Sequence, residues 1–391
     1  MGDRSPVIVG VADVPLENGR VIEETTPLRM LADVSRRSLA ECGLTVGDVD
    51  GLLTAGAWGN PGPGRFPTMT LSEYMGLQVR FADSHNVGGS SFEAHVAHAA
   101  MAIESGYCDV ALIVYGSLQK TEASRTLAGR SPILTMQFES PWGMLTPVGG
   151  YALAAHRHMH QYGTTSEQLA EIAVAARSWA SLNPAATKRG PLTVDDVLAS
   201  DLVSDPLHRL DCCLVTDGGG AVVMTTAENA RSMSVTPVQV VGYGEAESHW
   251  NIAAMPDLTV TTAARSGRRA FEMAGMSPAD IDVAEIYDSF TITVLLTLES
   301  LGFCGPGEGG AFVSGGRIGP KGEFPMNTNG GGLSYAHPGM YGIFLIIEAV
   351  RQLRGEAGVR QVLDARTALV NGTGGTLSST GTCILATGSG R

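Results

Sequence analysis

The stretch that decides the fold runs from Asn327 to Tyr341 and reads N-T-N-G-G-G-L-S-Y-A-H-P-G-M-Y. Its three consecutive glycines allow the backbone to approach a ligand more closely than side chains would permit. Pro338 restricts His337 to an extended conformation, which fixes the direction of the imidazole ring. Residues 342–355 are apolar, helix-length and closed by a glycine, so His337 and Tyr341 are expected at the start of a helix. The unpaired N–H groups there favour developing negative charge.

Residues 336–342 read A-H-P-G-M-Y-G and resemble the last active-site loop of the thiolase superfamily, G-H-P-x-G-x-x-G. The resemblance extends along almost the whole chain, since residues 162–165, 183–186 and 206–213 look like the loop domain of the sterol-carrier-type thiolases. It implies an α/β protein with the thiolase fold, in which duplicated five-layered αβαβα halves carry an inserted loop domain. Without this resemblance, a histidine in a glycine-rich loop would be interpreted as a partner for a backbone carbonyl.

Apolar runs of strand and helix length alternate along the chain, which predicts sheets with helices on both faces. In the first half we expect strands at 6–11, 49–54 and 110–116 and helices at 26–42 and 92–105. After a strand at 221–225 the scheme restarts, with strands at 238–243, 283–286, 367–371 and 382–387 and helices at 258–274 and 289–301. This similar element order is the duplication that the resemblance implies.

The domain boundaries follow from a change of composition between these two series. We expect an N-terminal half at 1–118 with 211–232, an inserted loop domain at 119–210, and a C-terminal half at 233–391. The insertion contains two helical stretches, 149–162 and 166–181. A Gly/Pro loop at 58–67 is typical of a flexible rim or a dimer contact rather than a core.

Bulk composition excludes several classes of function. A formal net charge of −13 over 391 residues argues against nucleic-acid and anionic-membrane partners. No signal-peptide pattern and no apolar run of membrane-spanning length is found, which predicts a soluble, cytoplasmic protein. The six cysteines show no metal-ligand spacing and are expected as free thiols. No metal site and no cofactor are expected, because CoA would be part of the substrate.

Thiolases attack an acyl-CoA with a cysteine at the start of a buried helix, where the helix dipole lowers the thiol pKa. The matching position in this chain is about Gly89, and no cysteine lies there. A second cysteine usually stands in a C-x-G loop, which corresponds here to residues 371–375 and again lacks one. Thiolase activity is therefore not expected. The glycines and serines of these two loops are predicted to bind the substrate: Gly88, Gly89, Ser90, Ser91, Gly374 and Gly375.

A third motif, residues 285–290, reads E-I-Y-D-S-F. Thiolases have N-E-A-F or H-D-C-F here, so Tyr287 replaces the asparagine or histidine that helps bind the thioester oxygen. Tyr287 together with Tyr341 resembles the thiolase-fold aldolases that shorten steroid side chains. Those enzymes cleave a β-hydroxyacyl-CoA, here a 17-hydroxy steroid with a three-carbon side chain, into a ketone and propionyl-CoA. A tyrosine at a strand end also caps loops, and Asp288, predicted to bind substrate, would otherwise be a helix cap.

Retro-aldol cleavage needs a base for the β-hydroxyl proton, an electron sink and an acid for the enolate. The resemblance implies that Tyr287, Tyr341 and His337 are catalytic. We assign Tyr341 as the base and Tyr287 as the acid, with the reverse order left open. His337 and the backbone N–H groups near residues 88–91 are expected to stabilise negative charge on the thioester oxygen.

Two alternatives and several partners remain open. The chain could be an acyltransferase that uses Ser90 or Ser91 as its nucleophile, or a non-catalytic acyl-CoA-binding subunit. The resemblance implies a homodimer and a separate small partner with an OB fold and a zinc ribbon, forming a heterotetramer. Arg157, Lys188 and Arg189 are candidates for binding the CoA phosphates.

Overall fold

The computed structural model describes residues 3–56, 64, 66–122, 133–144 and 147–388. Most of the Gly/Pro loop predicted at 58–67 lies outside these residues. Within them, no helix has the length and apolar character needed to cross a membrane.

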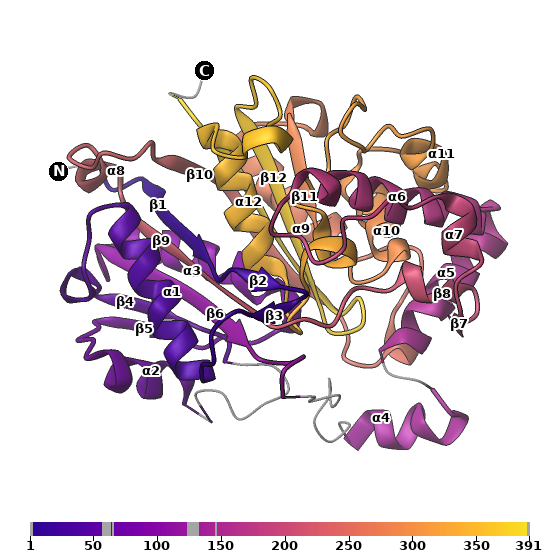
Figure 1. Cartoon of the computed structure of the whole chain (residues 1–391), viewed down its shortest axis with the longest axis horizontal. Helices are drawn as coiled ribbons and strands as arrows, with labels where there is room; N and C mark the ends of the chain where they lie inside the picture. Colours follow the sequence, from indigo (N-terminus) through magenta and orange to yellow (C-terminus); the bar gives the residue numbers. More distant parts are fainter. Residues whose placement is uncertain (1–2, 57–63, 65, 123–132, 145–146, 389–391) are drawn as a thin grey trace.

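Each half of the chain contributes one part of a mixed β-sheet (Figure 1). In the N-terminal half the strand order is β1-β9-β6-β4-β5, formed by β1 (Pro6–Asp13), β4 (Gly51–Leu53), β5 (Phe81–Asp83), β6 (Val110–Ser117) and β9 (Gly218–Thr226). In the C-terminal half the order is β10-β13-β12-β11, formed by β10 (Val238–Glu247), β11 (Val283–Ile286), β12 (Thr367–Gly374) and β13 (Ser379–Ala386). In both parts the second strand runs antiparallel to its two neighbours, which is the expected duplication.

A short pairing of β1 with β10 joins the two parts into one nine-stranded sheet. Only Val7 with Gln239 and Ile8 with Val238 are paired across this seam. Two small hairpins lie apart from the main sheet: β2 (Leu16–Glu17) with β3 (Arg20–Val21), and β7 (Leu202–Ser204) with β8 (Leu207–His208).

Two helices form the central layer, α3 (Ser91–Glu104) and α12 (Gly342–Arg354). Both contact strands of both halves, and most residues of each helix are buried. The outer layers are α1 (Pro27–Glu41) with α2 (Pro67–Met75) on one side and α9 (Ala263–Ala274) with α10 (Thr291–Leu301) on the other. The predicted five-layered architecture is confirmed. Each candidate active-site loop lies where a strand or a loop meets the start of a helix.

The insertion lies beside the C-terminal half (Figure 1). Its helices are α4 (Ile133–Phe138), α5 (Val148–Tyr162), α6 (Ser166–Leu182) and α7 (Val194–Leu198), and both α5 and α6 pack on α10. Thr165 caps α6 in a reciprocal box with Gln168, so this start is encoded locally. Short helices α8 (Ala227–Ala230) and α11 (Gly309–Val313) complete the described chain.

Several elements were not predicted, and one helix was predicted with the wrong start. Helix α2 and strand β5 were not predicted, although Pro67 at the first turn of α2 is a recognised start signal. The helix expected at 258–274 begins only at Ala263, because residues 259–262 are β-branched and Asp257 accepts hydrogen bonds from the Thr259 N–H and hydroxyl.

Candidate active site

Tyr287 follows the last residue of β11 and packs directly against Gly89. Its own N–H donates to the Asn371 carbonyl on β12 (2.9 Å), which extends the strand pairing by one residue. A Cβ atom at position 89 would stand 2.6 Å from the Tyr287 Cζ atom and 2.5 Å from the Thr373 carbonyl oxygen. The phenol ring therefore fills the space that a side chain at position 89 would need. This gives a structural reason for the missing cysteine.

The Tyr287 hydroxyl is the meeting point of the three residues predicted to be catalytic. Its oxygen lies 2.9 Å from His337 Nε2 and accepts a hydrogen bond from the Tyr341 N–H (3.1 Å). The Tyr287 ring stands nearly perpendicular to both neighbouring rings, at centroid distances of 5.7 Å from His337 and 5.8 Å from Tyr341. The structure thus brings together residues 50 and 54 positions apart in the chain.

Burial sets the protonation of this group. It lowers the pKa of His337 to about 4, so the imidazole is neutral near pH 7. Burial, with a further contribution from Cys213, raises the pKa of Tyr287 well above its usual value. A neutral phenol accepts from the Tyr341 N–H and donates to Nε2 at the same time. Tyr287 and His337 retain 4% and 6% of their surface, whereas Tyr341 retains none.

The loop that carries His337 is held from two sides by its backbone. The His337 N–H donates to Thr216 Oγ1 (2.9 Å), and the Thr216 N–H donates to the His337 carbonyl (3.2 Å). From β6, the Tyr115 hydroxyl donates to the Pro338 carbonyl and accepts from the Met340 N–H (3.2 Å). The position of the imidazole is therefore set by contacts that no local sequence pattern reveals.

Tyr341 immediately precedes α12, as the sequence predicted. Its hydroxyl donates to Asn329 Oδ1 (2.7 Å), which also accepts from the Gly331 N–H (2.8 Å). Because an amide oxygen only accepts, the Tyr341 proton points toward Asn329. Burial, and then the nearby Asp288, raise the pKa of Tyr341 well above its usual value. Asn329 lies in the N-T-N-G-G-G run but was not assigned a role from the sequence.

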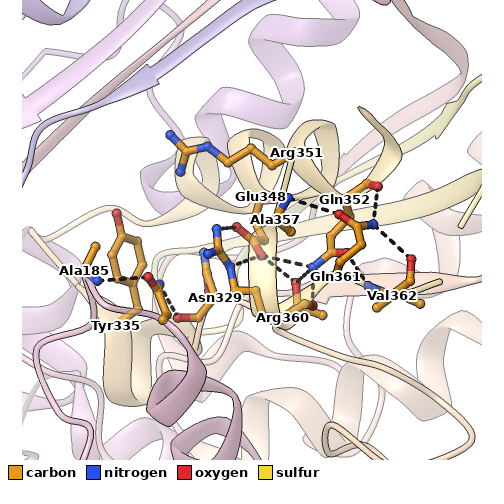
Figure 2. A network of polar contacts seen from close by, with 12 residues as sticks. Ala185, Asn329, Tyr335, Glu348, Arg351, Gln352, Ala357, Arg360, Gln361 and Val362 are labelled. Atoms are coloured by element: carbon orange, nitrogen blue, oxygen red, sulfur yellow. Dashed lines mark hydrogen bonds and ion pairs between the residues drawn. The ribbon is translucent and has the colours of Figure 1, made fainter. Parts of the chain in front are cut away.

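A buried polar network supports the backbone on which Asn329 stands (Figure 2). The Thr328 hydroxyl lies between the carboxyl groups of Glu285 and Glu348, at 2.8 Å from each. Arg360 makes a two-pronged ion pair with Glu348, at 2.8 and 2.9 Å. Gln352 Nε2 donates to Thr328 Oγ1 (2.9 Å) and to the Arg360 carbonyl (3.0 Å). In Figure 2, Glu348 and Gln352 lie on α12 and Arg360 lies on the segment that follows it.

Asp288 faces the glycine-rich turn rather than Tyr287. Its two carboxyl oxygens accept from the N–H groups of Gly332 (2.6 Å) and Leu333 (3.1 Å), within the π-helical turn Gly331–Tyr335. A Cβ atom at Gly331 would lie 2.7 Å from the Asp288 Cγ atom. Burial raises the pKa of Asp288 to about 7. Its contacts are those of a loop clamp, and the predicted contact with substrate stays a prediction.

The two loops predicted to bind substrate are packed together. A Cβ atom at Gly88 would stand 2.8 Å from the Gly375 nitrogen, so Gly88 lies against the 374–375 turn. Ser91 Oγ donates to the Gly88 carbonyl (2.6 Å), and Ser90 Oγ lies 2.9 Å from Ser379 Oγ. Among the described residues, neither serine hydroxyl contacts a histidine or a carboxylate. A nucleophilic serine has no base in this arrangement.

The insertion reaches the same region through Tyr151 on α5. Its hydroxyl donates to the Gly375 carbonyl (3.1 Å), and its ring packs on Phe290 at a centroid distance of 4.3 Å. Nothing in the sequence distinguished this tyrosine. The candidate phosphate ligands Arg157 and Arg189 are exposed to solvent. The Arg157 side chain donates a hydrogen bond to Gln161, and the Arg189 side chain donates one to the Ser181 carbonyl. Their role stays a prediction.

Replacing Gly89 with alanine is expected to destabilise the protein by about 1–3 kcal/mol, because the new methyl group overlaps the Tyr287 ring and the Thr373 carbonyl. Urea unfolding monitored by circular dichroism would measure the loss. Gly43→Ala is a poor control because its φ is positive, so Gly47→Ala, whose Cβ meets only Thr45 Oγ1 at 3.7 Å, is the matched variant. Equal stability of the two variants would contradict the packing described for Tyr287.

The chain is similar to known proteins over most of its length. A family model described as thiolase C-terminal domain-like matches residues 244–387. The chain is 34% identical to 17-hydroxy-3-oxo-4-pregnene-20-carboxyl-CoA lyase of Mycobacterium tuberculosis, over 93% of this chain and 95% of that protein. It is 33% identical to an acetyl-CoA acetyltransferase of Methanothermobacter thermautotrophicus, over 89% of this chain and 91% of that protein.

A solved structure described as the Ltp2-ChsH2(DUF35) aldolase superposes with a TM-score of 0.87 at 30% identity, covering 98% of both chains. Similarity over nearly the full length, to proteins named as a CoA lyase, an acetyltransferase and an aldolase, confirms the resemblance inferred from the H-P-G loop and the two tyrosines. The chain belongs to the thiolase superfamily.

Proposed function

We propose that the protein is a retro-aldolase that cleaves a β-hydroxyacyl-CoA, in particular a 17-hydroxy steroid carrying a three-carbon side chain as its CoA thioester. The products are a ketone and propionyl-CoA. The observation that carries this proposal is the Tyr287 hydroxyl, which lies 2.9 Å from His337 Nε2 while its ring occupies the space beside Gly89. Relatives named lyase and acetyltransferase are almost equally similar in sequence, so the site rather than the identity favours the lyase.

The reaction balances without an oxidant or a covalent acyl-enzyme. The base removes the β-hydroxyl proton, the C–O bond becomes a carbonyl, and the electrons of the Cα–Cβ bond move to the thioester oxygen. The resulting enolate takes one proton at Cα and becomes propionyl-CoA. Each step is a proton transfer or a charge shift, which positioned acid, base and hydrogen-bond donors accelerate.

The hydrogen bonds favour the reverse of the order assigned from the sequence. The Tyr287 hydroxyl lies within hydrogen-bond distance of His337 Nε2, so the two groups can pass a proton between them and form the pair that accepts the hydroxyl proton. The Tyr341 N–H donates to the same oxygen and stabilises negative charge on it. Tyr341, whose proton points to Asn329, is the donor to the enolate after its hydroxyl rotates. His337 and Tyr287 are the partners that retain surface.

We further propose that the chain works with a second, smaller subunit. The similar solved structure is described as an Ltp2-ChsH2(DUF35) aldolase, whose two-part name supports a separate partner subunit. The OB fold and the zinc ribbon of that partner are what the resemblance to the thiolase-fold aldolases implies. A homodimer, a heterotetramer with that partner, and a cytoplasmic location are part of the same proposal.

The test is incubation with the 17-hydroxy steroid thioester, with and without the partner subunit. Mass spectrometry is expected to find the 17-ketosteroid and propionyl-CoA in equal amounts. Three other outcomes would contradict the proposal: free acid with CoA, an acylated serine on the polypeptide, or tight binding without turnover in the presence of the partner. The second would restore the acyltransferase alternative, and the third the non-catalytic one.

A further inference from the structure

Glu93, on the first turn of α3, is a buried carboxyl group that the proposed reaction does not use. It retains 1% of its surface, and neither carboxyl oxygen has a hydrogen-bond partner in another residue of the described chain. A carboxylate in such a position would lack the donors or cations that buried charges require. How the fold makes room for this buried carboxyl group therefore needs an explanation.

Glycines line that space from three elements. A Cβ atom at Gly342, the first residue of α12, would lie 2.5 Å from Glu93 Oε2. A Cβ atom at Gly372 on β12 would lie 2.5 Å from Glu93 Cδ, and one at Gly381 on β13 would lie 2.6 Å from Glu93 Cβ. Any side chain at these positions would displace the Glu93 side chain. The three glycines therefore leave the space that this side chain occupies, which we call the glycine-lined cavity.

The cavity adjoins the segments that carry the candidate active site. Gly342 follows Tyr341, Gly372 precedes the 373–375 loop, and Glu93 lies one helical turn after Gly89. The Gly89 carbonyl oxygen and Glu93 Oε2 both fall within contact distance of the same point, the place of a Gly342 Cβ atom. Gly89 in turn supports the Tyr287 ring. Gly89 thus lies between Glu93 and the Tyr287 ring.

We propose that Glu93 is a positioning residue that acts as a neutral, protonated acid. In that state it fills the glycine-lined cavity and fixes the start of α12, β12 and Gly89 relative to one another. Ionisation would place a negative charge beside the Gly89 carbonyl oxygen and push the two apart, which moves the backbone under Tyr287. The consequence for catalysis rests on the proposed function, whereas the protonation state does not.

Among the described residues that face Glu93, none supplies a counter-charge. From α12 and β12 the facing residues are Gly342 and Gly372, which carry no side chain. From β13 the titratable neighbour is Cys383, whose thiol donates to the Glu93 carbonyl (3.5 Å) and whose pKa burial raises well above its usual value. Burial likewise raises the pKa of Glu93 to about 8, against the lowering effect of its own N–H. Near pH 7 the proton is retained.

The test compares wild type with Glu93→Gln, which keeps the shape without the charge. Because the folded-state pKa of Glu93 is raised, its protonation contributes stability that is fully present below about pH 4.5 and is lost as pH rises toward about 8. Relative to Glu93→Gln, urea unfolding of wild type is expected to lose up to about tenfold in the folding equilibrium constant per pH unit across this interval. Parallel curves for the two proteins would overturn the proposal, whether or not the protein cleaves a thioester.

The second readout is the pH profile of cleavage by the complex with its partner. Wild-type kcat is expected to fall above about pH 8, and Glu93→Gln to keep its activity at least about one pH unit further. A shared alkaline limb would overturn the positioning role even if unfolding behaved as expected. If neither protein cleaves the thioester, the proposed function fails, and the pH dependence of propionyl-CoA binding replaces kcat as the readout. Glu93→Ala, which leaves a cavity, is expected to lose stability at every pH.

Discussion

Replacing Tyr287 with phenylalanine is expected to lower kcat for thioester cleavage by about 10²–10⁴-fold, the range typical of a lost general acid or base. The ring, which fills the space beside Gly89, remains, so the fold should be retained. What disappears is the oxygen that lies 2.9 Å from His337 Nε2 and accepts the Tyr341 N–H. Single-turnover kinetics would separate this chemical step from product release.

A matched control is available in Tyr335. It is buried like Tyr287, but its hydroxyl donates to Asp13, a carboxylate that Arg351 also binds. Tyr335→Phe should therefore reduce stability more than turnover. A Tyr287→Phe variant with kcat within severalfold of wild type would contradict the role proposed for this hydroxyl.

The roles of the two tyrosines are separated by hydrogen exchange in propionyl-CoA. Exchange of its α-protons with deuterated solvent requires only the group that protonates the enolate. If Tyr341 is that donor, Tyr341→Phe should lose exchange, while Tyr287→Phe should keep exchange and lose cleavage. The opposite pattern would restore the order in which Tyr341 is the base.

The sequence located the candidate site because its signals are local. A proline after His337, a glycine run before it and a glycine-terminated helix after Tyr341 are each read within a few residues. The same holds for α1, α5 and α6, whose predicted ends lie within one or two residues of the observed ones. Element order together with the resemblance to thiolases then predicted the duplicated halves.

Contacts between distant segments were beyond such reasoning. The packing of the Tyr287 ring on Gly89 depends on how β11, α3 and α12 meet. The same is true of the hydrogen bond that the Tyr341 hydroxyl donates to Asn329. Local rules also gave the wrong start for α9, where side-chain bonding at Asp257 competes with the helix. Glu93 was given no role from the sequence, and the glycines packed on it become visible only in the structure.

Arg360 is the second residue whose replacement should have a large effect. Arg360→Met is expected to lower the free energy of unfolding by about 3–5 kcal/mol near neutral pH, since it leaves the buried carboxylate of Glu348 without its cation. Burial, and then repulsion from Glu348, raise the pKa of the neighbouring Glu285 well above its usual value. Without Arg360, Glu348 would be a second carboxyl group that lacks a cation in the same buried network.

The pH dependence distinguishes lost charge pairing from lost packing. Without Arg360, the buried negative charge of Glu348 has no ion-pair partner, and taking up a proton in the folded state would remove that cost. The stability of the variant should therefore recover as pH falls toward the ordinary carboxyl range and decline as pH rises. Urea unfolding at several pH values measures this slope. A deficit that is the same at every pH would assign the loss to the missing side-chain volume.

The double variant Glu348→Gln/Arg360→Met separates the effect of the unpaired charge from that of the missing Arg360 side chain. It removes both charges of the pair, so it should be more stable than Arg360→Met alone at neutral pH, as expected when an unpaired buried charge causes the damage. Because Thr328 is bonded to Glu348 and precedes Asn329, the single variant should also disturb the acceptor of the Tyr341 hydroxyl. We therefore expect Arg360→Met to slow α-proton exchange in propionyl-CoA, and the double variant to recover part of it. Exchange at the wild-type rate in Arg360→Met would show that the network supports the fold without positioning Tyr341.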